Sequence, residues 1–407
     1  MPLPGLRRML GRDPDEHERA STPLELFFDL CFVVAVSFAS IELHHGFLEG
    51  HGGQYVVGYV MVFFAIWWAW MGFTWFASAY DTDDWFYRVA TLVQIAGVLV
   101  LAAGVSDALA GNDYRAVTIG YLVMRLGLVS QWLRVAVSHP DNRPVALTYV
   151  VGLVGIQAGW IGRLWLPEAA TYVSFFLLVA LELALPALAT RHGRRMPWHP
   201  GHIAERYGLC TLIVLGESVL AASNAVVKGI AEADDPTPLV GVALAGLLIA
   251  FGMWWLYFLK PVYADLDTAR TALGWGYGHY FVFASAAALS AGLELSIDET
   301  LQHVGDSVDA VPGEHAVALD AVTTAALTTV PVAVFLFATW LLMLRPLADR
   351  TLDAYLVTAT VLTLAMTFTP FPILLTALVM TVTVAVVVAR GVRLSRAGAA
   401  APLDVAG

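Results

Sequence analysis

Charged residues are scarce in this sequence of 407 residues, and cysteine is scarcer still. Asp, Glu, Lys and Arg make up 14% of the chain, whereas a soluble domain carries about a quarter. Basic residues number 22 against 33 acidic ones, and the net charge of −11 argues against a nucleic-acid partner, which would select a basic surface. The two cysteines, Cys31 and Cys210, lie in apolar runs, which argues against a disulfide framework or a thiolate metal site.

Recognised catalytic and targeting signatures are missing as well. The sequence has no nucleophile elbow, Walker loop, dinucleotide fingerprint or zinc-protease motif. The first 22 residues are polar and of mixed charge, and no A-x-A-like site follows the first apolar run, so we expect no cleavable signal peptide. We therefore expect no cofactor and no ATP-driven or hydrolytic activity, although a membrane enzyme of another kind stays open.

Long apolar runs are what the sequence has in abundance, since 58% of its residues are apolar. A bilayer crossing takes about 20 apolar residues, and open strands cannot cross because their backbone groups would stay unpaired. The sequence therefore predicts an all-α polytopic transmembrane bundle of about twelve spans. The expected spans are 23–43, 55–77, 86–107, 115–137, 145–166, 169–190, 203–227, 238–259, 275–297, 317–344, 353–369 and 371–390, the last two alternatively forming a re-entrant pair.

Basic residues are distributed unevenly between the two sides of these spans. If the N-terminus is cytoplasmic, seventeen Lys and Arg fall on the cytoplasmic side and three, Arg115, Arg163 and Lys228, on the outer side. This bias predicts a plasma-membrane protein with both termini in the cytoplasm.

Two motifs recur about 180–187 residues apart. Glu25–Phe27 followed by Cys31 matches Glu205–Tyr207 followed by Cys210. Trp67-Trp68 precedes an acidic segment at Tyr80–Asp83, and Trp254-Trp255 precedes another at Tyr263–Asp267. The recurrence predicts two parallel six-helix halves, related by an axis along the membrane normal. The expected boundaries are a cytoplasmic segment 1–22, a half 23–190, a linker 191–202, a half 203–390 and a tail 391–407.

Four charged residues fall inside the predicted spans, where charge is costly and usually faces a partner or a cavity. They are Asp29, Glu217, Arg125 and Glu182. Arg125 is the expected partner of Asp29 and Glu217 if these form structural ion pairs. The functional alternative is a proton or cation site in a polar cavity.

Three further residues lie at predicted span ends. Glu25 completes a capping box with Thr22, and we expect it to act mainly as a cap. Glu205 has no such box, and a pair with neighbouring Arg206 is one explanation. His279 is able to change charge near neutral pH, or is simply a hydrogen-bonded interface residue.

Aspartates cluster in two predicted cytoplasmic loops, Asp81, Asp83 and Asp84 in the first and Asp265 and Asp267 in the second. Paired acidic clusters of this kind hold Mg²⁺ against a diphosphate in some enzymes. Ordinary solvated loop charge is the alternative, and no metal site is expected elsewhere.

Two segments resemble the bacterial low-temperature-requirement protein A (LtrA) family. They are Thr22–Leu30, which enters the first span, and Glu205–Gly208 with Ile213–Ser218. The resemblance implies a multi-span membrane protein of undefined biochemical activity. Phe27-Phe28-Asp29 also resembles the first-helix motif of a lysosomal potassium-channel family, which favours ion passage.

Taken together, these features predict a transporter or channel for a small solute or cation, with or without coupling to protons. Asp29, Glu217, Glu25 and Glu205 would line the path, with Arg125 as counter-charge and Glu182 and His279 as further candidates. The alternatives are a membrane-embedded enzyme acting on a lipid or prenyl diphosphate, and a stress-related membrane protein without turnover. The oligomeric state is left open.

Overall fold

The computed structural model describes residues 5–13, 16, 19–191, 196–232, 235–260, 266, 268–305, 320–347 and 349–396. Within this part of the chain all regular structure is helical and no strand occurs. Among the described residues, twelve helices are long and apolar enough to cross a bilayer, which confirms the predicted all-α fold of about twelve spans. The last two, Arg350–Phe368 and Pro372–Arg393, each meet this criterion, so their lengths do not require a re-entrant pair.

The chain divides into two compact units whose boundary passes through three helices. Unit 1 comprises Met1–Ala39 and Met61–Tyr207, and unit 2 comprises Ser40–Val60 and Gly208–Gly407. The helices that cross the boundary are α1 (Pro23–Leu48), α2 (Gly52–Tyr80) and α8 (Pro200–Glu232). These units differ from the predicted halves at residues 40–60 and at the start of α8, and the internal repeat stays a prediction.

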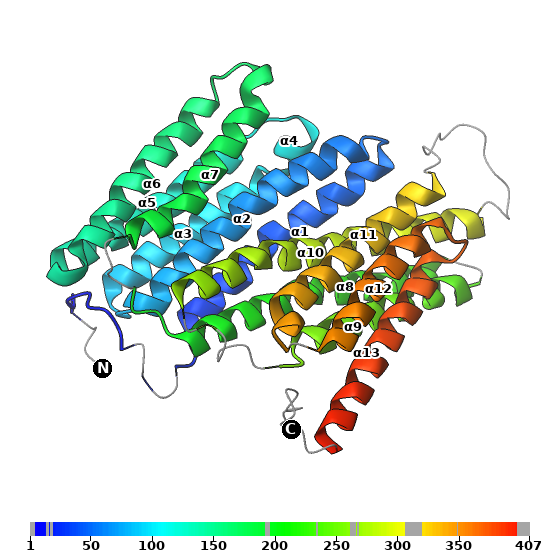
Figure 1. The fold of residues 1–407 in the computed structure, drawn as a ribbon. Coiled ribbons are helices and arrows are strands. Elements are labelled where there is room, and N and C mark those ends of the chain that lie inside the picture. The colour runs from blue at the N-terminus through cyan, green and yellow to red at the C-terminus, as the bar shows by residue number, and fades with distance from the viewer. Residues whose placement is uncertain are drawn as a thin grey trace. The chain divides into compact units, whose positions relative to one another are not determined.

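Unit 1 is completed by a bundle of consecutive helices (Figure 1). They are α3 (Trp85–Ala103), the short α4 (Val105–Ala110), α5 (Arg115–Ser138), η1 (Pro140–Asn142), α6 (Arg143–Arg163), η2 (Glu168–Ala170) and α7 (Thr171–Ala189). Helix α3 packs on α5, α5 on α6, and α6 on α7. Glycines bring α3 and α5 close: a Cβ on Gly120 would lie 2.5 Å from the carbonyl oxygen of Gly97. Such close approach through small residues is typical of membrane helices.

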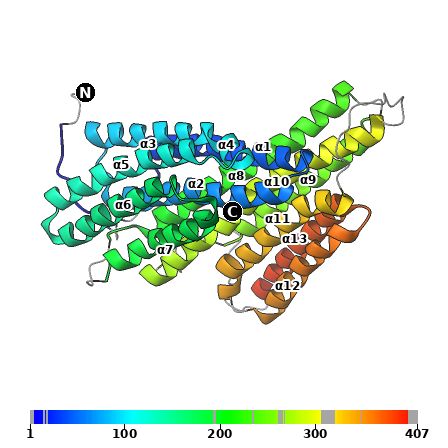
Figure 2. The same ribbon diagram turned by 90° about the horizontal axis from the view of Figure 1, so that it is seen from above.

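Unit 2 holds the remaining helices, of which α11, α12 and α13 lie together in Figure 2. They are α9 (Thr237–Tyr257), α10 (Ala269–Gly305), α11 (Ala321–Thr339), the turns η4 (Trp340–Leu344) and η5 (Arg345–Leu347), α12 (Arg350–Ala365), η6 (Met366–Phe368) and α13 (Pro372–Arg396). Helix α10 packs on α11, and α9 packs on α13. With 37 residues, α10 is longer than the roughly 20 residues that a crossing needs.

The surface of α1 shows why the helices need lipid. Leu30, Val34 and Phe38 are 56%, 39% and 45% exposed, although they are large and apolar. Phe28 and Phe32, on the other face, are buried. Soluble proteins rarely expose contiguous apolar surface of this kind, so the exposed face is the one that contacts the bilayer.

Candidate functional site

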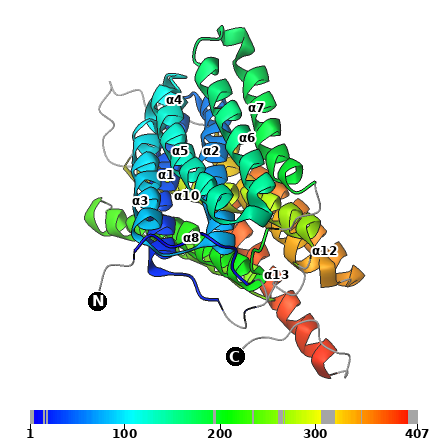
Figure 3. The same ribbon diagram turned by 90° about the vertical axis from the view of Figure 1, so that its left-hand side faces the viewer.

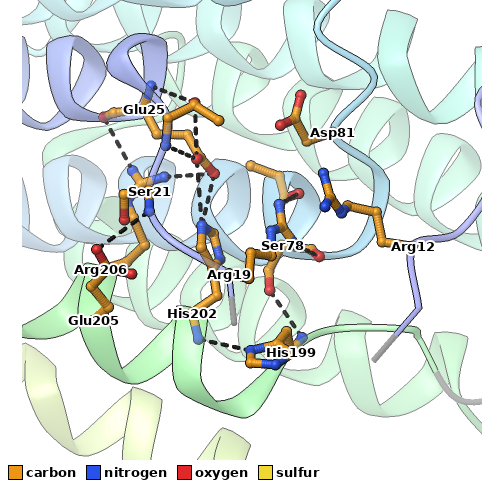
Figure 4. Close-up of polar contacts among 12 residues, drawn as sticks. Arg12, Arg19, Ser21, Glu25, Ser78, Asp81, His199, His202, Glu205 and Arg206 are labelled. Atoms are coloured by element: carbon orange, nitrogen blue, oxygen red, sulfur yellow. Dashed lines mark hydrogen bonds and ion pairs between the residues drawn. The ribbon is translucent and has the colours of Figure 1, made fainter. Parts of the chain in front are cut away.

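The helices α1 and α8 begin in the same way, and their starts form the candidate site (Figure 4). At α1, the amide of Thr22 donates to Glu25 Oε2 at 2.8 Å, and the amide of Glu25 donates to Thr22 Oγ1 at 3.3 Å. This geometry confirms the predicted capping box. At α8, the amide of His202 donates to His199 Nδ1 at 3.1 Å. Each helix therefore has a side-chain cap followed by a proline, Pro23 in α1 and Pro200 in α8, at its first position.

The two helix starts carry complementary charges in register. Glu25 and His202 are the third residues of their helices, and Asp29 and Arg206 are the seventh. Each pair is 177 residues apart in sequence and in contact, because the helix starts lie side by side in the same direction. All four side chains are buried, with at most 1% of each residue exposed. We call Glu25, Asp29, His202 and Arg206 the α1–α8 cluster.

Arg206 holds both carboxylates of this cluster, but not equally. Its Nη2 donates to Asp29 Oδ1 at 2.5 Å and its Nε to Asp29 Oδ2 at 3.1 Å, a bidentate pair. Trp70 Nε1 adds a donor to Asp29 Oδ1 at 2.7 Å. Glu25 Oε1 lies 3.0 Å from Arg206 Nη1, yet neither atom has an aligned hydrogen bond within the described structure. Asp29 is thus the firmly held carboxylate and Glu25 the looser one.

His202 offers a place for a proton in the same cluster. Its Nε2 lies 3.2 Å from Glu25 Oε1, whereas its Nδ1 is buried and has no hydrogen-bond partner among the described residues. A neutral imidazole that donates through Nε2 leaves Nδ1 as an acceptor, and the protonated ring leaves it as a donor. With neutral His202, two carboxylates face one guanidinium, which leaves one negative charge uncompensated. Such a charge is costly away from water, so the cluster favours an added proton or cation.

Asp81 and Arg19 lie next to this cluster, at the end of α2 (Figure 4). The guanidinium of Arg19 donates to the carbonyl oxygens of Ser78 and Ala77, two of the last carbonyls of α2. Burial, and then the negative charge of Glu25, raises the pKa of Asp81 to about 6. When Asp81 is ionised, the charges of Asp81 and Arg19 cancel and the excess negative charge of the cluster remains. A single bound proton therefore neutralises the whole group.

The N-terminal segment lies against this end of unit 1, a feature that the sequence did not indicate. Met9 is fully buried, and the amide of Arg12 donates to the carbonyl oxygen of Ala79 at 2.9 Å. The amide of Arg7 donates to Asp84 Oδ2 at 2.9 Å. The described residues before α1 thus cover the end of α2 near the α1–α8 cluster.

The expected partner of Asp29 was wrong. Arg125 instead pairs with Glu182 of α7, whose Oε2 lies 3.7 Å from Arg125 Nη2, and both side chains are buried. Glu182 also accepts from Trp68 Nε1 at 2.8 Å and from the Tyr121 hydroxyl at 2.7 Å. We call Arg125 and Glu182 the α5–α7 pair. The sequence shows that both residues are deep in spans, but which helices pack together is a property of the tertiary fold.

The first aspartate cluster is divided among separate roles. Asp84 caps α3 by accepting from the amide of Tyr87 at 3.0 Å, and it also pairs with Arg134. Asp83 pairs with Arg88 on the surface at 2.7 Å. Asp265 and Asp267 lie outside the described residues. In the part of the chain that is described, no group of three or more His, Cys, Asp or Glu side chains is suited to hold a metal ion.

Three other candidates are not members of the α1–α8 cluster. Glu205 is exposed and accepts from the amide of Ser21 at 3.3 Å. Glu217 belongs to the stretch of α8 in unit 2, where it is half-buried. His279, in α10 of unit 2, is fully buried; its Nε2 lies 3.0 Å from the Tyr257 hydroxyl and its Nδ1 lies 2.8 Å from the carbonyl oxygen of Trp275. His279 is thus a core residue rather than an interface residue.

Sequence reasoning missed His202 and Arg206 as members of the site. It placed the start of the seventh span at residue 203, which left Arg206 in the first turn and His202 outside. The signal was present in His199-Pro200, since a proline commonly follows a capping residue at a helix start. Glu25 was also underestimated, because its carboxylate serves both the cap and the contact with Arg206.

Comparisons with known proteins cover most of the chain. A family model described as bacterial low temperature requirement A protein (LtrA) matches residues 20–391, which confirms the resemblance that the two motifs indicated. An uncharacterized protein of Rhizobium meliloti (strain 1021) is 25% identical over 277 residues, 61% of this chain and 60% of that protein. The matched region thus spans less than two thirds of that relative. No solved structure matches the chain.

Proposed function

The chain belongs to the bacterial low temperature requirement A (LtrA) family and is a multi-pass membrane protein. From this premise we propose that it transports a small solute or cation, and that the α1–α8 cluster is its proton or cation site. The observation that carries the proposal is the charge imbalance of this cluster. Two buried carboxylates share one guanidinium inside helices that are apolar enough to span a membrane. Intramembrane charge without full compensation is typical of ion and proton pathways.

We assign the exchange of the proton or cation to Glu25 and His202 rather than to Asp29. The carboxylate of Asp29 has three aligned donors, two from Arg206 and one from Trp70. Glu25 Oε1 and His202 Nδ1 have no aligned partner in the described structure. A proton or cation gained at Glu25 or His202 removes the excess charge without breaking the pair between Arg206 and Asp29.

The proposed orientation has both termini in the cytoplasm, which puts the α1–α8 cluster near the cytoplasmic face. The basic-residue bias supports it. After replacement of Cys31 and Cys210 by alanine, a cysteine introduced at Ser307 should react with an impermeant reagent in intact cells. A cysteine at Gly193 should react only after permeabilisation, and the opposite pattern would contradict this orientation.

A flux assay with matched variants tests the transport proposal. The full chain is reconstituted in liposomes that contain a pH indicator, and proton and cation fluxes are measured under gradients of sodium, potassium and pH. Glu25→Gln keeps the cap, because glutamine also serves at this position, but removes the charge. We expect it to lower the flux about 5- to 150-fold, the usual range of coupling between sites.

Glu205→Gln is the matched control, because it makes the same chemical change on an exposed side chain at the start of α8. Its flux should stay within about twofold of the wild type, as expected for a surface change. Flux no greater than that of empty liposomes in the wild type, or an unaltered flux in Glu25→Gln, would refute the proposal.

A further inference from the structure

Unit 1 has a cavity at the end opposite to the α1–α8 cluster, where the short α4 lies in Figure 3. Its volume is about 410 Å³, and it is formed by the segment Gly111–Arg115, the end of α6 and the start of α7. A narrower space of about 30 Å³ shares Tyr114 and Arg163 with it. That inner space has mainly apolar and aromatic walls, which include Phe64 and Phe175.

Arg163 is the unusual residue of this cavity. It is 8% exposed, and its guanidinium lies over the rings of Tyr114 and Phe175, 5.0 and 5.7 Å from their centroids. Nε donates to the carbonyl oxygen of Thr171 at 3.3 Å, whereas Nη2 is buried and has no hydrogen-bond partner among the residues that the structure describes. No carboxylate among the side chains that the structure describes lies within ion-pair distance of Arg163.

A buried guanidinium without a counter-charge among the described side chains needs an explanation. Its place in the last turn of α6 gives a favourable interaction with the helix dipole, and the two rings add cation–π attraction. Neither interaction satisfies the N–H donors of Nη2, and an unmet charged donor is costly when buried. Arg163 thus presents a planar, permanently charged donor in the wall of a cavity large enough for a small molecule.

We infer that this cavity binds a small oxyanion, a carboxylate or phosphate group, with Arg163 as its principal donor. Guanidinium matches the geometry of both groups and binds them through two parallel hydrogen bonds. Arg115, 77% exposed in its side chain, adds positive charge at the rim, where Asp113 offsets it only partly at 3.9 Å. Burial raises the pKa of Tyr114, so its hydroxyl stays protonated, and it donates to Met61 Sδ at 3.8 Å in the wall of the narrower space.

The inner space limits what the anion carries. Its volume of about 30 Å³ corresponds to a group of one or two carbons rather than to a ring or a long chain. A short carboxylate such as propionate fits both parts, with its charge at Arg163 and its carbons toward Phe64 and Phe175. The phosphate of a lipid headgroup offers the same oxyanion chemistry from a different source.

Binding to the purified full chain tests the inference independently of any flux. Propionate and inorganic phosphate are titrated by calorimetry into protein in nanodiscs of phosphatidylcholine alone. Arg163→Gln should weaken the binding about ten- to a hundredfold, whereas Arg163→Lys, which keeps the charge but not the planar fork, should weaken it less. Arg115→Gln, the matched change at the rim, should weaken it by less than about threefold.

The remaining outcomes are decisive as well. If soluble anions bind only weakly in phosphatidylcholine but phosphatidylglycerol raises the thermal stability of the wild type and not of Arg163→Gln, the oxyanion is a lipid headgroup. If neither soluble anions nor phosphatidylglycerol discriminate between the wild type and the Arg163 variants, the inference is wrong.

Glu168, whose side chain lies outside the described residues, provides the last check. Binding that appears only in Glu168→Gln would show that Arg163 already has an internal partner, and would overturn the inference.

Discussion

The described residues of unit 1 form two sites at which buried charged side chains meet inside the spans, and these sites differ in charge balance rather than in depth. In the α5–α7 pair, one arginine faces one glutamate, and both residues are at most 2% exposed. In the α1–α8 cluster, one arginine faces two carboxylates, with Glu25 and Arg206 equally buried. Burial alone therefore does not separate a structural pair from a candidate functional site.

The hydrogen-bond partners of Glu182 and of Glu25 also differ. Glu182 accepts from four neutral donors, the side chains of Trp68, Tyr121, Gln157 and Trp160. A carboxylate so surrounded is well solvated by the protein and needs no external ion. In the α1–α8 cluster, Glu25 Oε1 and His202 Nδ1 lack aligned partners. Arg125 Nε of the α5–α7 pair also lacks a hydrogen-bond partner among the described residues. The comparison therefore teaches that unmatched charge, rather than an unmet polar atom, separates the candidate site of exchange from the structural pair.

Loss of Arg206 should have the largest effect on the protein. Arg206→Gln leaves Glu25 and Asp29 buried beside each other without the cation that pairs with both, which should lower the free energy of unfolding by about 3–5 kcal/mol. Adding Asp29→Asn should restore much of this loss, because the remaining carboxylate then has no like charge beside it. The measurement is denaturant unfolding in mixed micelles for the wild type, both single variants and the double variant.

The α5–α7 pair provides the control for this cycle. The coupling energy between Asp29 and Arg206 should be about 2–3 kcal/mol, whereas that between Asp29 and Arg125 should be below about 0.5 kcal/mol. A large coupling between Asp29 and Arg125 would reinstate the pairing that the sequence suggested and remove the distinction between the two sites.

The sequence was sufficient for the fold class and the spans, because hydropathy depends only on local composition. Twelve apolar runs predict twelve membrane helices, and the ends differ by a few residues where capping residues extend them. Helix α8 begins at Pro200 rather than at residue 203, for instance, because His199 supplies its cap. Local chemistry also predicted the box between Thr22 and Glu25.

Pairing between spans was beyond the sequence, because it depends on which helices touch. Arg125 appeared to be the only central cation and was therefore matched to Asp29, whereas Arg206 was taken as an edge residue. Once α1 and α8 are aligned at their prolines, Glu25 faces His202 and Asp29 faces Arg206 with the same spacing. That alignment uses local signals only, so the correct partner was within reach of a comparison of helix starts.

The pH dependence of stability should follow Asp81, and its effect should be the second largest. The folded-state pKa is raised from 3.8 to about 6, so the folded protein holds this proton more tightly than the unfolded chain. The stabilisation that results from this tightly held proton is fully present below a pH of about 4 and is lost as the pH rises through 6. The total is about 3 kcal/mol, at about 1.4 kcal/mol per pKa unit.

Asp81→Asn should remove this loss of stability, because asparagine carries no charge. Asparagine also keeps an acceptor for the amide of Asp83, which lies 3.0 Å from Asp81 Oδ1 in the wild type. The variant should match the wild type near pH 4 and exceed its free energy of unfolding by about 3 kcal/mol at pH 7.5. Asp83→Asn, on an exposed side chain, is the control and should retain the wild-type slope. An unchanged slope in Asp81→Asn would show that another group near the α1–α8 cluster holds the proton.

The smallest effect is expected at Gln157, in the well-satisfied surroundings of the α5–α7 pair. Gln157 Nε2 donates to Glu182 Oε1 over 3.3 Å, and Gln157 Oε1 is buried without a hydrogen-bond partner in the described structure. Gln157→Met preserves the length of the side chain, gives up one long hydrogen bond and removes one unmet acceptor. These terms oppose each other, so the free energy of unfolding should change by less than about 1 kcal/mol in either direction.

The pH dependence of stability in Gln157→Met should stay that of the wild type, because Glu182 keeps the donors Trp68 and Tyr121 at 2.8 and 2.7 Å. Unfolding titrations at pH 5 and pH 7.5 measure both quantities. If the variant lost more than about 2 kcal/mol, or gained a new pH dependence, Glu182 would be as poorly compensated as Glu25, and the contrast between the two sites would fail.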